Sequence, residues 1–344
     1  MLFKIITIGW MIYILLHITV HKGIDKQYFS RENNNNYRGL FAVGIMLHHI
    51  SQQTACDGIF IIWRYVGFIF VSYFFFSSGY GLMLGVLEKK DYLKHFWKKR
   101  ILTLFVPYWI VNTLFVLREF SLGSRHSFWE YAASYLGFSR MEHLWYVSVI
   151  LISYVVFYFC FRLFKTRTAI GGMSIVCMVY IVLGCIFHLN ETWIASVSAF
   201  VIGILWKYEE EHIVVYLETG FLRKYVLVIL LFISLFAGRL LLALKGIDGI
   251  LLQTFMRNAI SISFVALILM TSMKVKWKDY RTFGFLGSIS YELYMIHPLF
   301  IAVRRSYLKS ESLYIIFVVA SSICSAFIIK KVSKLASTPS VRQQ

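Results

Sequence analysis

Arg38 and His49 stand at the two ends of one short apolar run, which reads RGLFAVGIMLHH over residues 38–49. Ionisable side chains inside a membrane helix are costly and usually serve a function. Helical geometry places the guanidinium and the imidazole about 16 Å apart along the axis. The spacing is close to three turns, so both side chains point to nearly the same face, whereas His48 points elsewhere. This polar stripe is typical of one wall of a reaction channel.

Each of the two side chains allows two interpretations. An imidazole takes up and returns a proton near neutral pH, which makes His49 the leading candidate for a catalytic base. The alternative is a histidine that is only hydrogen-bonded inside the helix bundle. The guanidinium of Arg38 is permanently charged and matches the oxygens of a phosphate group. The alternative for Arg38 is a positively charged anchor at a helix end.

The composition indicates a membrane protein. The chain has 344 residues, of which 59% are hydrophobic and only 15% charged. Apolar runs recur along it at about 17–25 residues, the length that crosses a bilayer as a helix. We therefore predict an all-α, polytopic transmembrane helical bundle. We read eleven apolar segments, at roughly 3–20, 39–53, 59–87, 101–118, 144–164, 169–187, 193–206, 225–243, 248–273, 283–303 and 312–329.

Charge and cysteine patterns exclude other classes. The net charge of +18 comes from Lys and Arg in the loops, as the positive-inside rule predicts, so no nucleic-acid partner is expected. The five cysteines show no CxxC spacing, so no metal site or disulfide is expected. Only three prolines occur, which predicts largely continuous helices. The polar tract Asn33–Asn36 is interpreted as a solvated loop.

The loop charges also predict an orientation in the cell membrane. Most Lys and Arg of the loops fall on one side, in residues 21–38, 88–100, 162–168, 207–224, 274–282 and the C-terminal stretch. We expect this side, with the C-terminus, to be cytoplasmic. The first segment is either a signal peptide or an uncleaved helix, and the sequence favours the helix because no small-residue cleavage site follows. His297 would then lie at a depth similar to that of His49.

Four other runs carry polar groups at helix ends or faces. Ser77-Ser78-Gly79-Tyr80 is either a close packing site or the lining of a ligand tunnel. Lys98-Lys99-Arg100, followed by Pro107-Tyr108-Trp109, is either ordinary positive-inside charge or a cradle for a polyanion. The third run is His143-Leu144-Trp145 at the outer end of a helix.

The fourth run combines polar and acidic residues in one apolar segment. Ser290, Tyr294 and His297 are spaced by four and three, so they share one helix face. Glu292 lies on another side. An acidic group in an apolar segment needs a partner.

Together these runs resemble the membrane acyltransferase 3 family, which acylates sugars and other cell-envelope molecules. The resemblance covers about residues 33–330. It rests on the Arg38 to His49 spacing and, in the expected order, on Phe75-Phe76-Ser77-Ser78-Gly79-Tyr80, Lys99-Arg100 with Pro107-Tyr108-Trp109, His143-Leu144-Trp145, and Ser290-Tyr291 with Tyr294 and His297.

The resemblance implies a ten-helix membrane domain over 33–330. Residues 1–20 would form an extra N-terminal helix, and 331–344 a cytoplasmic tail. The implied donor is cytoplasmic acetyl-CoA or another acyl-CoA, with no tightly bound cofactor and no metal. The implied acceptor is a hydroxyl group of a polysaccharide or lipid-linked glycan, reached among membrane lipids.

The resemblance also implies roles for single residues. His49 takes the position of the essential histidine, as a general base or as a carrier of the acyl group. Arg38, Arg100 and Lys99 would hold the donor, although Thr103 replaces a second arginine that is common in the family. Many members carry an acidic residue directly after the corresponding motif. No acidic residue follows Trp145-Tyr146-Val147-Ser148 in this chain. The residues expected on the acceptor side are Ser78, Tyr80, Trp145, Ser290, Tyr294 and His297.

Two rival functions remain open at this point. A transporter or flippase for an envelope precursor would also have many helices with interior polar groups. It predicts inverted repeats and broken helices, and no convincing internal repeat is present. A non-catalytic anchor of biosynthetic machinery is the other rival, and such an anchor has no need of the Arg38 to His49 stripe.

Overall fold

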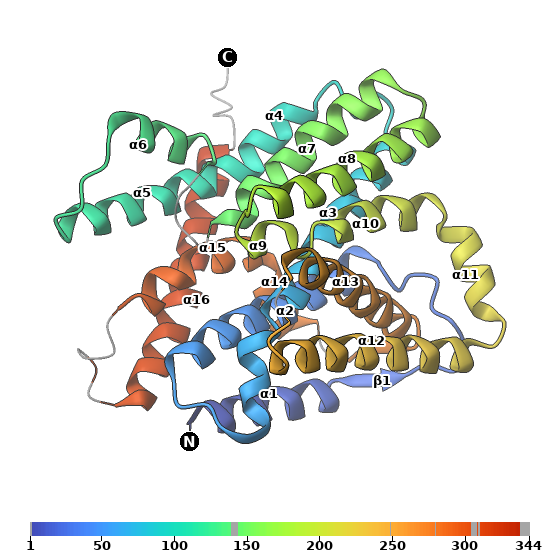
Figure 1. Ribbon diagram of the computed structural model, residues 1–344, viewed down its shortest axis with the longest axis horizontal. Helices are drawn as coiled ribbons and strands as arrows, with labels where there is room; N and C mark the ends of the chain where they lie inside the picture. The colour runs from blue at the N-terminus through green and yellow to red at the C-terminus, as the bar shows by residue number, and fades with distance from the viewer. Residues whose placement is uncertain are drawn as a thin grey trace, which may run out of the picture.

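Helices form nearly all of the protein in the computed structural model (Figure 1). It describes residues 2–138, 144–247, 249–278, 280–303, 308 and 310–337, except for the side chains of 99 and 337. The elements are α1 (Leu2–Leu16), β1 (Ile18–Val20), α2 (Arg31–Gln53), η1 (Gly58–Tyr65), α3 (Gly67–Glu88), α4 (Phe96–Arg100), η2 (Ile101–Phe105), α5 (Val106–Ser121), α6 (Phe128–Tyr135), α7 (Trp145–Leu163), α8 (Thr166–Ile186), α9 (Glu191–Ile194), α10 (Ser198–Tyr208), α11 (Glu210–Glu218), α12 (Phe221–Leu244), α13 (Ile250–Ser272), β2 (Val275–Trp277), α14 (Arg281–Ser288), α15 (Ser290–Ile301) and α16 (Glu311–Ser337).

The fold class predicted from composition is confirmed. Within the described ranges, seven helices are long and apolar enough to cross a membrane. One of them runs continuously through α4, η2 and α5, and the others are α3, α7, α8, α12, α13 and α16. Along α12 nearly every side chain is at least partly exposed, which suits a helix that faces lipid. The protein is an all-α, multi-pass membrane protein.

Several predicted segments are divided, so the expected continuity was wrong there. The segment 59–87 splits into the 3-10 helix η1 and α3, and the segment 193–206 is divided between the end of α9 and α10. The segment 283–303 splits at Ile289 into α14 and α15. Proline is not needed for such a break where a side chain binds the backbone groups that a helix end leaves unpaired. Between α9 and α10, Asn258 of α13 donates to the Ile194 carbonyl at 2.7 Å and accepts from the Ser198 amide at 3.3 Å.

The tract Asn33–Asn36 is helical and largely buried, which corrects the expected solvated loop. α2 begins at Arg31, and the Ser30 hydroxyl caps it by accepting from the amide of Asn33. Asn36 is 0% exposed, and the Asn35 amide donates to the Gly284 carbonyl of α14 at 2.6 Å. Asparagine favours loops when its amide is solvated. Here tertiary partners take the place of water for Asn34 and Asn35, whereas no partner of the buried Asn36 amide lies among the described residues.

Elements that the hydropathy pattern did not predict join the ends of the bundle. β1 pairs antiparallel with β2, with Ile18 opposite Trp277, and so brings the residues after α1 beside those after α13. The short helices α6 and α11 lie at opposite edges of the molecule in Figure 1. α16 continues to Ser337, so the expected tail at 331–344 begins inside a helix.

Glycines allow the two helices that carry the site to approach their neighbours closely. A Cβ at Gly287 of α14 would overlap the Asn35 carbonyl oxygen of α2. A Cβ at Gly79 of α3 would overlap the Phe200 carbonyl oxygen of α10, and Gly203 of α10 meets Phe76 in the same way. Small residues of this kind let membrane helices pack backbone to backbone. Gly79 of this run is therefore a packing contact, as one of the two interpretations of the run predicted.

We expect Gly287→Ala to destabilise the protein by about 1–3 kcal/mol, because α2 and α14 must move apart to admit the methyl group. Thermal unfolding in detergent measures the effect. The matched control is Gly171→Ala, since nothing lies within 4 Å of a Cβ built at this position of α8. A Gly287→Ala protein as stable as the Gly171→Ala control would contradict the close crossing.

Candidate active site

A cavity of 540 Å³ lies within the helix bundle. This volume falls in the range of about 300–1,000 Å³ that is usual for ligand sites. Its wall comes from α2, α3, η2, α7, α15 and α16, and from Arg100 at the end of α4. The residues that line it are Arg31, Asn34, Arg38, Ile45, Val71, Phe74, Ser77, Ser78, Gly81, Arg100, Thr103, Leu104, Tyr146, Ile150, Tyr154, Ser290, Tyr291, Tyr294 and Lys330.

The charged groups of this lining are all positive. They are Arg31, Arg38, Arg100 and Lys330. Among the described residues, no carboxylate lies within ion-pair distance of Arg38, whose guanidinium is 5.9 Å from the Phe74 ring centre. Cations that share a cavity without matching carboxylates attract an anionic ligand. The cavity is therefore suited to a ligand with several negative charges.

Aromatic and hydroxyl groups hold Arg100 in place. Its guanidinium donates to the Tyr92 hydroxyl at 2.7 Å and lies 5.0 Å from the Tyr154 ring centre. Tyr154 in turn shares a hydrogen bond of 2.6 Å with Ser78 of α3. An arginine fixed in this way loses less conformational entropy when it binds a ligand. Ser78 thus lines the cavity, although the adjacent Gly79 is a packing contact.

The cations gather at one end of the cavity. Asn34 accepts from the hydroxyl groups of Tyr73 and Ser77 on α3, at 3.1 and 3.0 Å. Ser77 is next to Ser78, which binds the Tyr154 that supports Arg100. Asn34 lies between Arg31 and Arg38 on α2, and these contacts put Arg100 of α4 near the same level of the bundle.

The buried acid Glu292 belongs to the same end of the cavity. It is 0% exposed, and one of its oxygens lies 3.1 Å from Lys330 Nζ. Lys330 is thus the partner that an acidic group in an apolar segment needs. The pair links α15 to α16 across the cavity wall. It also leaves Lys330 facing the cavity with its charge compensated, unlike that of Arg38.

Histidines lie beyond the other end of the cavity. Ile45 lines the cavity, and His49 follows it by about one turn of α2. The His49 ring centre is 5.2 Å from that of His297 on α15, which is only 1% exposed. Tyr294 lines the cavity and places its ring 6.2 Å from the His297 ring. Neither histidine is among the lining residues, but both stand directly past its apolar end.

The structure thus brings together most of the residues singled out from the sequence. Arg38, Arg100, Ser78, Ser290 and Tyr294 share the cavity wall. His49 and His297 meet at one level, as the matching depths of their helices predicted. The side chain of Lys99 and the whole of His143 lie outside the described residues.

Tyr80 and Trp145 lie apart from the cavity lining. The Tyr80 hydroxyl donates to Glu210 at 2.8 Å, and Tyr28 donates to the same oxygen at 2.7 Å. Burial, followed by the nearby Glu210 carboxylate, raises the pKa of Tyr28, so this phenol remains a donor. Trp145 lies 6.3 Å from the Phe75 ring. The Tyr80 environment is typical of a structural network that joins α3 to α11.

Other lining residues escaped sequence reasoning. Three tyrosines lie within aromatic-rich segments and do not stand out there: Tyr146, Tyr154 and Tyr291. Lys330 looks like an ordinary charge just after the last predicted segment. The signal for Lys330 was the acid Glu292, which required a cation. The signal for Asn34 was its place four residues before Arg38, a spacing that puts both on one face once the tract is helical.

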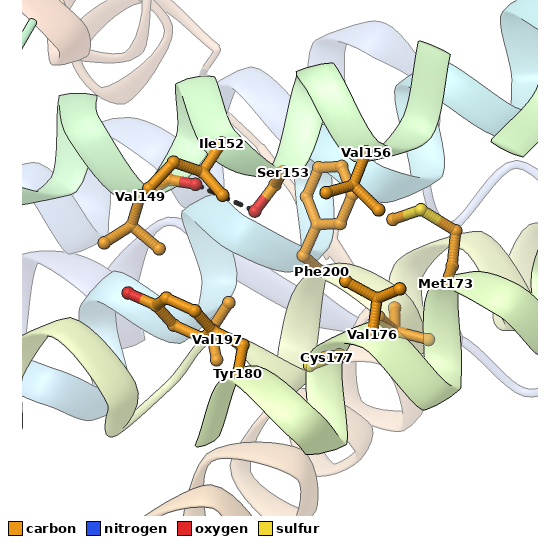
Figure 2. A pocket seen from close by; sticks show the side chains of 11 residues that line it. Val149, Ile152, Ser153, Val156, Met173, Val176, Cys177, Tyr180, Val197 and Phe200 are labelled. Atoms are coloured by element: carbon orange, nitrogen blue, oxygen red, sulfur yellow. Dashed lines mark hydrogen bonds between the residues drawn. The ribbon is translucent and has the colours of Figure 1, made fainter. Parts of the chain in front are cut away.

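A second cavity, of 60 Å³, lies between α7, α8 and α10 (Figure 2). Its lining is mostly aliphatic, including Val149, Val176 and Met173. The Ser153 hydroxyl beside it donates to the Val149 carbonyl at 2.9 Å, so it is already paired. Within its lining no carboxylate, histidine or cation is present. This cavity is therefore no rival to the larger one as a reaction site.

Comparisons with known proteins identify the family. No curated protein and no solved structure matches the chain. A family profile described as an acyltransferase domain matches residues 35–331, which is most of the chain. The matched range includes Arg38, His49, Arg100 and His297. The chain belongs to the membrane acyltransferase 3 family and is a multi-pass membrane acyltransferase.

Proposed function

We propose that this acyltransferase moves a short acyl group, acetyl first among the candidates, from acyl-CoA to a hydroxyl group of an envelope or capsular polysaccharide or of its lipid-linked precursor. The observation that carries the proposal is the cavity, with its cations at one end and a histidine pair past the other. An acyl-CoA has the matching asymmetry, since its phosphates are at one end and its thioester is at the other.

The cationic end suits the nucleotide of the donor. Arg38 and Arg100 offer forked donors to the 3′-phosphate and the pyrophosphate, with Lys99 as a further candidate from the sequence. The loop charges favour the same end as the cytoplasmic one, where acyl-CoA is available. The slender pantetheine arm would then extend along α2 toward the apolar end at Ile45 and Tyr294.

The histidine end suits the transfer step. His49 takes the proton of the acceptor hydroxyl while that oxygen attacks the thioester carbonyl. The carbon–sulfur bond breaks, and the CoA thiolate leaves and receives the proton. In the second route, an imidazole nitrogen attacks the thioester carbonyl, and the CoA thiolate leaves with the ring proton. The acceptor hydroxyl then attacks the acyl group on the ring, the nitrogen–acyl bond breaks, and the hydroxyl proton returns to the imidazole. In either route, the acceptor is proposed to be oriented by Ser290, Tyr294 and His297 of α15. Trp145, the first residue of α7, is proposed to contribute as well.

Labelled acetyl-CoA and oriented membrane vesicles test donor and orientation together. Inverted vesicles expose the cytoplasmic face, and with wild-type protein and surface polysaccharide enclosed in their lumen they should transfer label from acetyl-CoA supplied outside. Right-side-out vesicles should not. Succinyl-CoA in parallel samples measures the preference for the acyl group. Transfer by right-side-out vesicles alone would contradict the proposed orientation. No transfer from either donor would contradict an acyl-CoA donor.

A further inference from the structure

One glutamine bridges the two adjacent histidines of α2. The Gln52 amide nitrogen lies 3.2 Å from His48 Nε2, and the Gln52 amide oxygen lies 3.3 Å from His49 Nδ1. His48 is also bound on its other side, since its Nδ1 lies 2.7 Å from the carbonyl oxygen of Trp63. A chain of hydrogen bonds therefore runs from the Trp63 backbone through His48 and Gln52 to His49.

The Trp63 carbonyl, at one end of this series of hydrogen bonds, determines which atom donates and which accepts in each of them. A carbonyl oxygen only accepts, so neutral His48 carries its proton on Nδ1 and accepts at Nε2. The group of Gln52 that faces His48 must then be the amide NH₂, which turns the amide oxygen toward His49. That oxygen also only accepts, so His49 carries its proton on Nδ1. In neutral His49, Nε2 is then the nitrogen with the lone pair.

We propose that Gln52 is a positioning residue of the transfer reaction, which holds His49 as the Nδ1–H tautomer and makes Nε2 its reactive atom. The inference rests on the function proposed above and deepens it. As Nε2 takes the proton of the acceptor hydroxyl, the ring becomes positively charged. The Nδ1–H to Gln52 bond then strengthens, because its donor is now charged. In the covalent route, the same tautomer directs Nε2 to the thioester carbonyl.

Several ionisable groups lie near His49 and influence its charge. Among the described residues, the rings of His48 and His297 lie close to that of His49, with centres at 4.8 and 5.2 Å. Arg64 of η1 binds the carbonyl groups at the end of α2, and Glu311 of α16 accepts from the Ala55 amide just past it at 3.2 Å. Gln52 contributes no charge, so it can set the tautomer without itself titrating.

Two substitutions at this position separate positioning from mere packing. Gln52→Leu keeps the volume and removes both hydrogen bonds. We expect kcat to fall by about 10–100-fold, within the contribution of a positioned base, while the KM for acyl-CoA stays unchanged. Gln52→Glu keeps an acceptor for His49 Nδ1–H and adds a negative charge. It should favour the imidazolium and move the acid limb of the pH–rate profile up by about 1 pH unit.

The matched control is Gln53→Leu, because Gln53 is the neighbouring glutamine at the last position of α2 and is exposed, as Gln52 is. Among the described residues its side chain makes no hydrogen bond to a histidine, unlike that of Gln52. It should keep wild-type kcat and pH profile. Wild-type values in Gln52→Leu would overturn the proposal. So would an acid limb in Gln52→Glu that does not move. The amount of each variant in the membrane is measured. If Gln52→Leu fails to accumulate, the acid limb of the Gln52→Glu pH–rate profile decides whether the proposal holds.

A readout without turnover distinguishes this inference from the proposed function. In protein labelled with ¹⁵N-histidine, the His49 signals are assigned by their loss in His49→Ala. Neutral His49 should show a protonated Nδ1 and an unprotonated Nε2, and Gln52→Leu should mix the two tautomers. An unmixed Nε2–H tautomer in the wild type would overturn the inference even in an active enzyme. The expected tautomer in a protein without acyltransferase activity would instead overturn the proposed function.

Discussion

The His49→Ala protein is expected to insert into the membrane at the wild-type level and to lose acyl transfer by at least about 100-fold. A positioned base contributes about 10²–10⁴-fold, and a covalent carrier cannot be replaced at all. The side chain lies past the apolar end of the cavity, so its loss leaves the cationic end intact. Acetyl-CoA binding should therefore persist while transfer stops, and both are measured on the purified protein.

The control for this substitution is His212→Ala. His212 has a side chain that is 88% exposed, and it pairs only locally with Glu209. This variant should transfer acyl groups at the wild-type rate. Full activity in His49→Ala would remove His49 from the mechanism, whichever of the two routes is considered.

The second large effect is expected from Arg38→Gln, which should weaken the binding of acetyl-CoA by about 10–100-fold. Hydrogen bonds to charged groups contribute about 1.5–3 kcal/mol, and each 1.36 kcal/mol corresponds to a factor of ten. Arg38→Lys keeps the charge but not the fork, so it should recover only part of the affinity. Equilibrium binding of labelled acetyl-CoA measures all three proteins.

The matched control is Arg167→Gln, because Arg167 is an exposed cation near the start of α8 on the same predicted side of the membrane. Its affinity should equal that of the wild type. An unchanged affinity in Arg38→Gln would show that the donor phosphates bind elsewhere. Raising the salt concentration should weaken acetyl-CoA binding more in the wild type than in Arg38→Gln, because the variant has one fewer cation at the site for salt to screen.

The sequence predicted the fold class, and it grouped Arg38 with His49 as candidates, because both inferences depend on periodicity. Hydropathy identified the membrane helices, and helical spacing put Arg38 and His49 on one face. The same spacing grouped Ser290 with Tyr294, which now share the cavity wall. Glu292 was recognised as an acid in need of a cation, although only the fold reveals Lys330 as that cation.

The remainder of the site depends on neighbours that are distant in the chain. The Asn33–Asn36 tract was interpreted as solvated because amides need hydrogen-bond partners, and α3 and α14 supply them to Asn34 and Asn35 in place of water. Tyr80 was expected near the acceptor, but Glu210 lies across from it and binds its hydroxyl. Helix breaks at Ile289 and Val66 were hidden because apolar residues continue through them. Helical periodicity predicts which face of a helix a residue occupies, but it does not predict which residues pack against that face.

The central claim is that this protein esterifies a surface polysaccharide through His49. It is tested most directly by the O-acyl content of that polysaccharide, read by proton NMR before and after mild base. The samples come from a deletion strain and from the same strain complemented with the wild-type or the His49→Ala protein. We predict that the ester signal disappears on deletion and returns only with the wild type. An ester content that stays the same in all strains would contradict the claim.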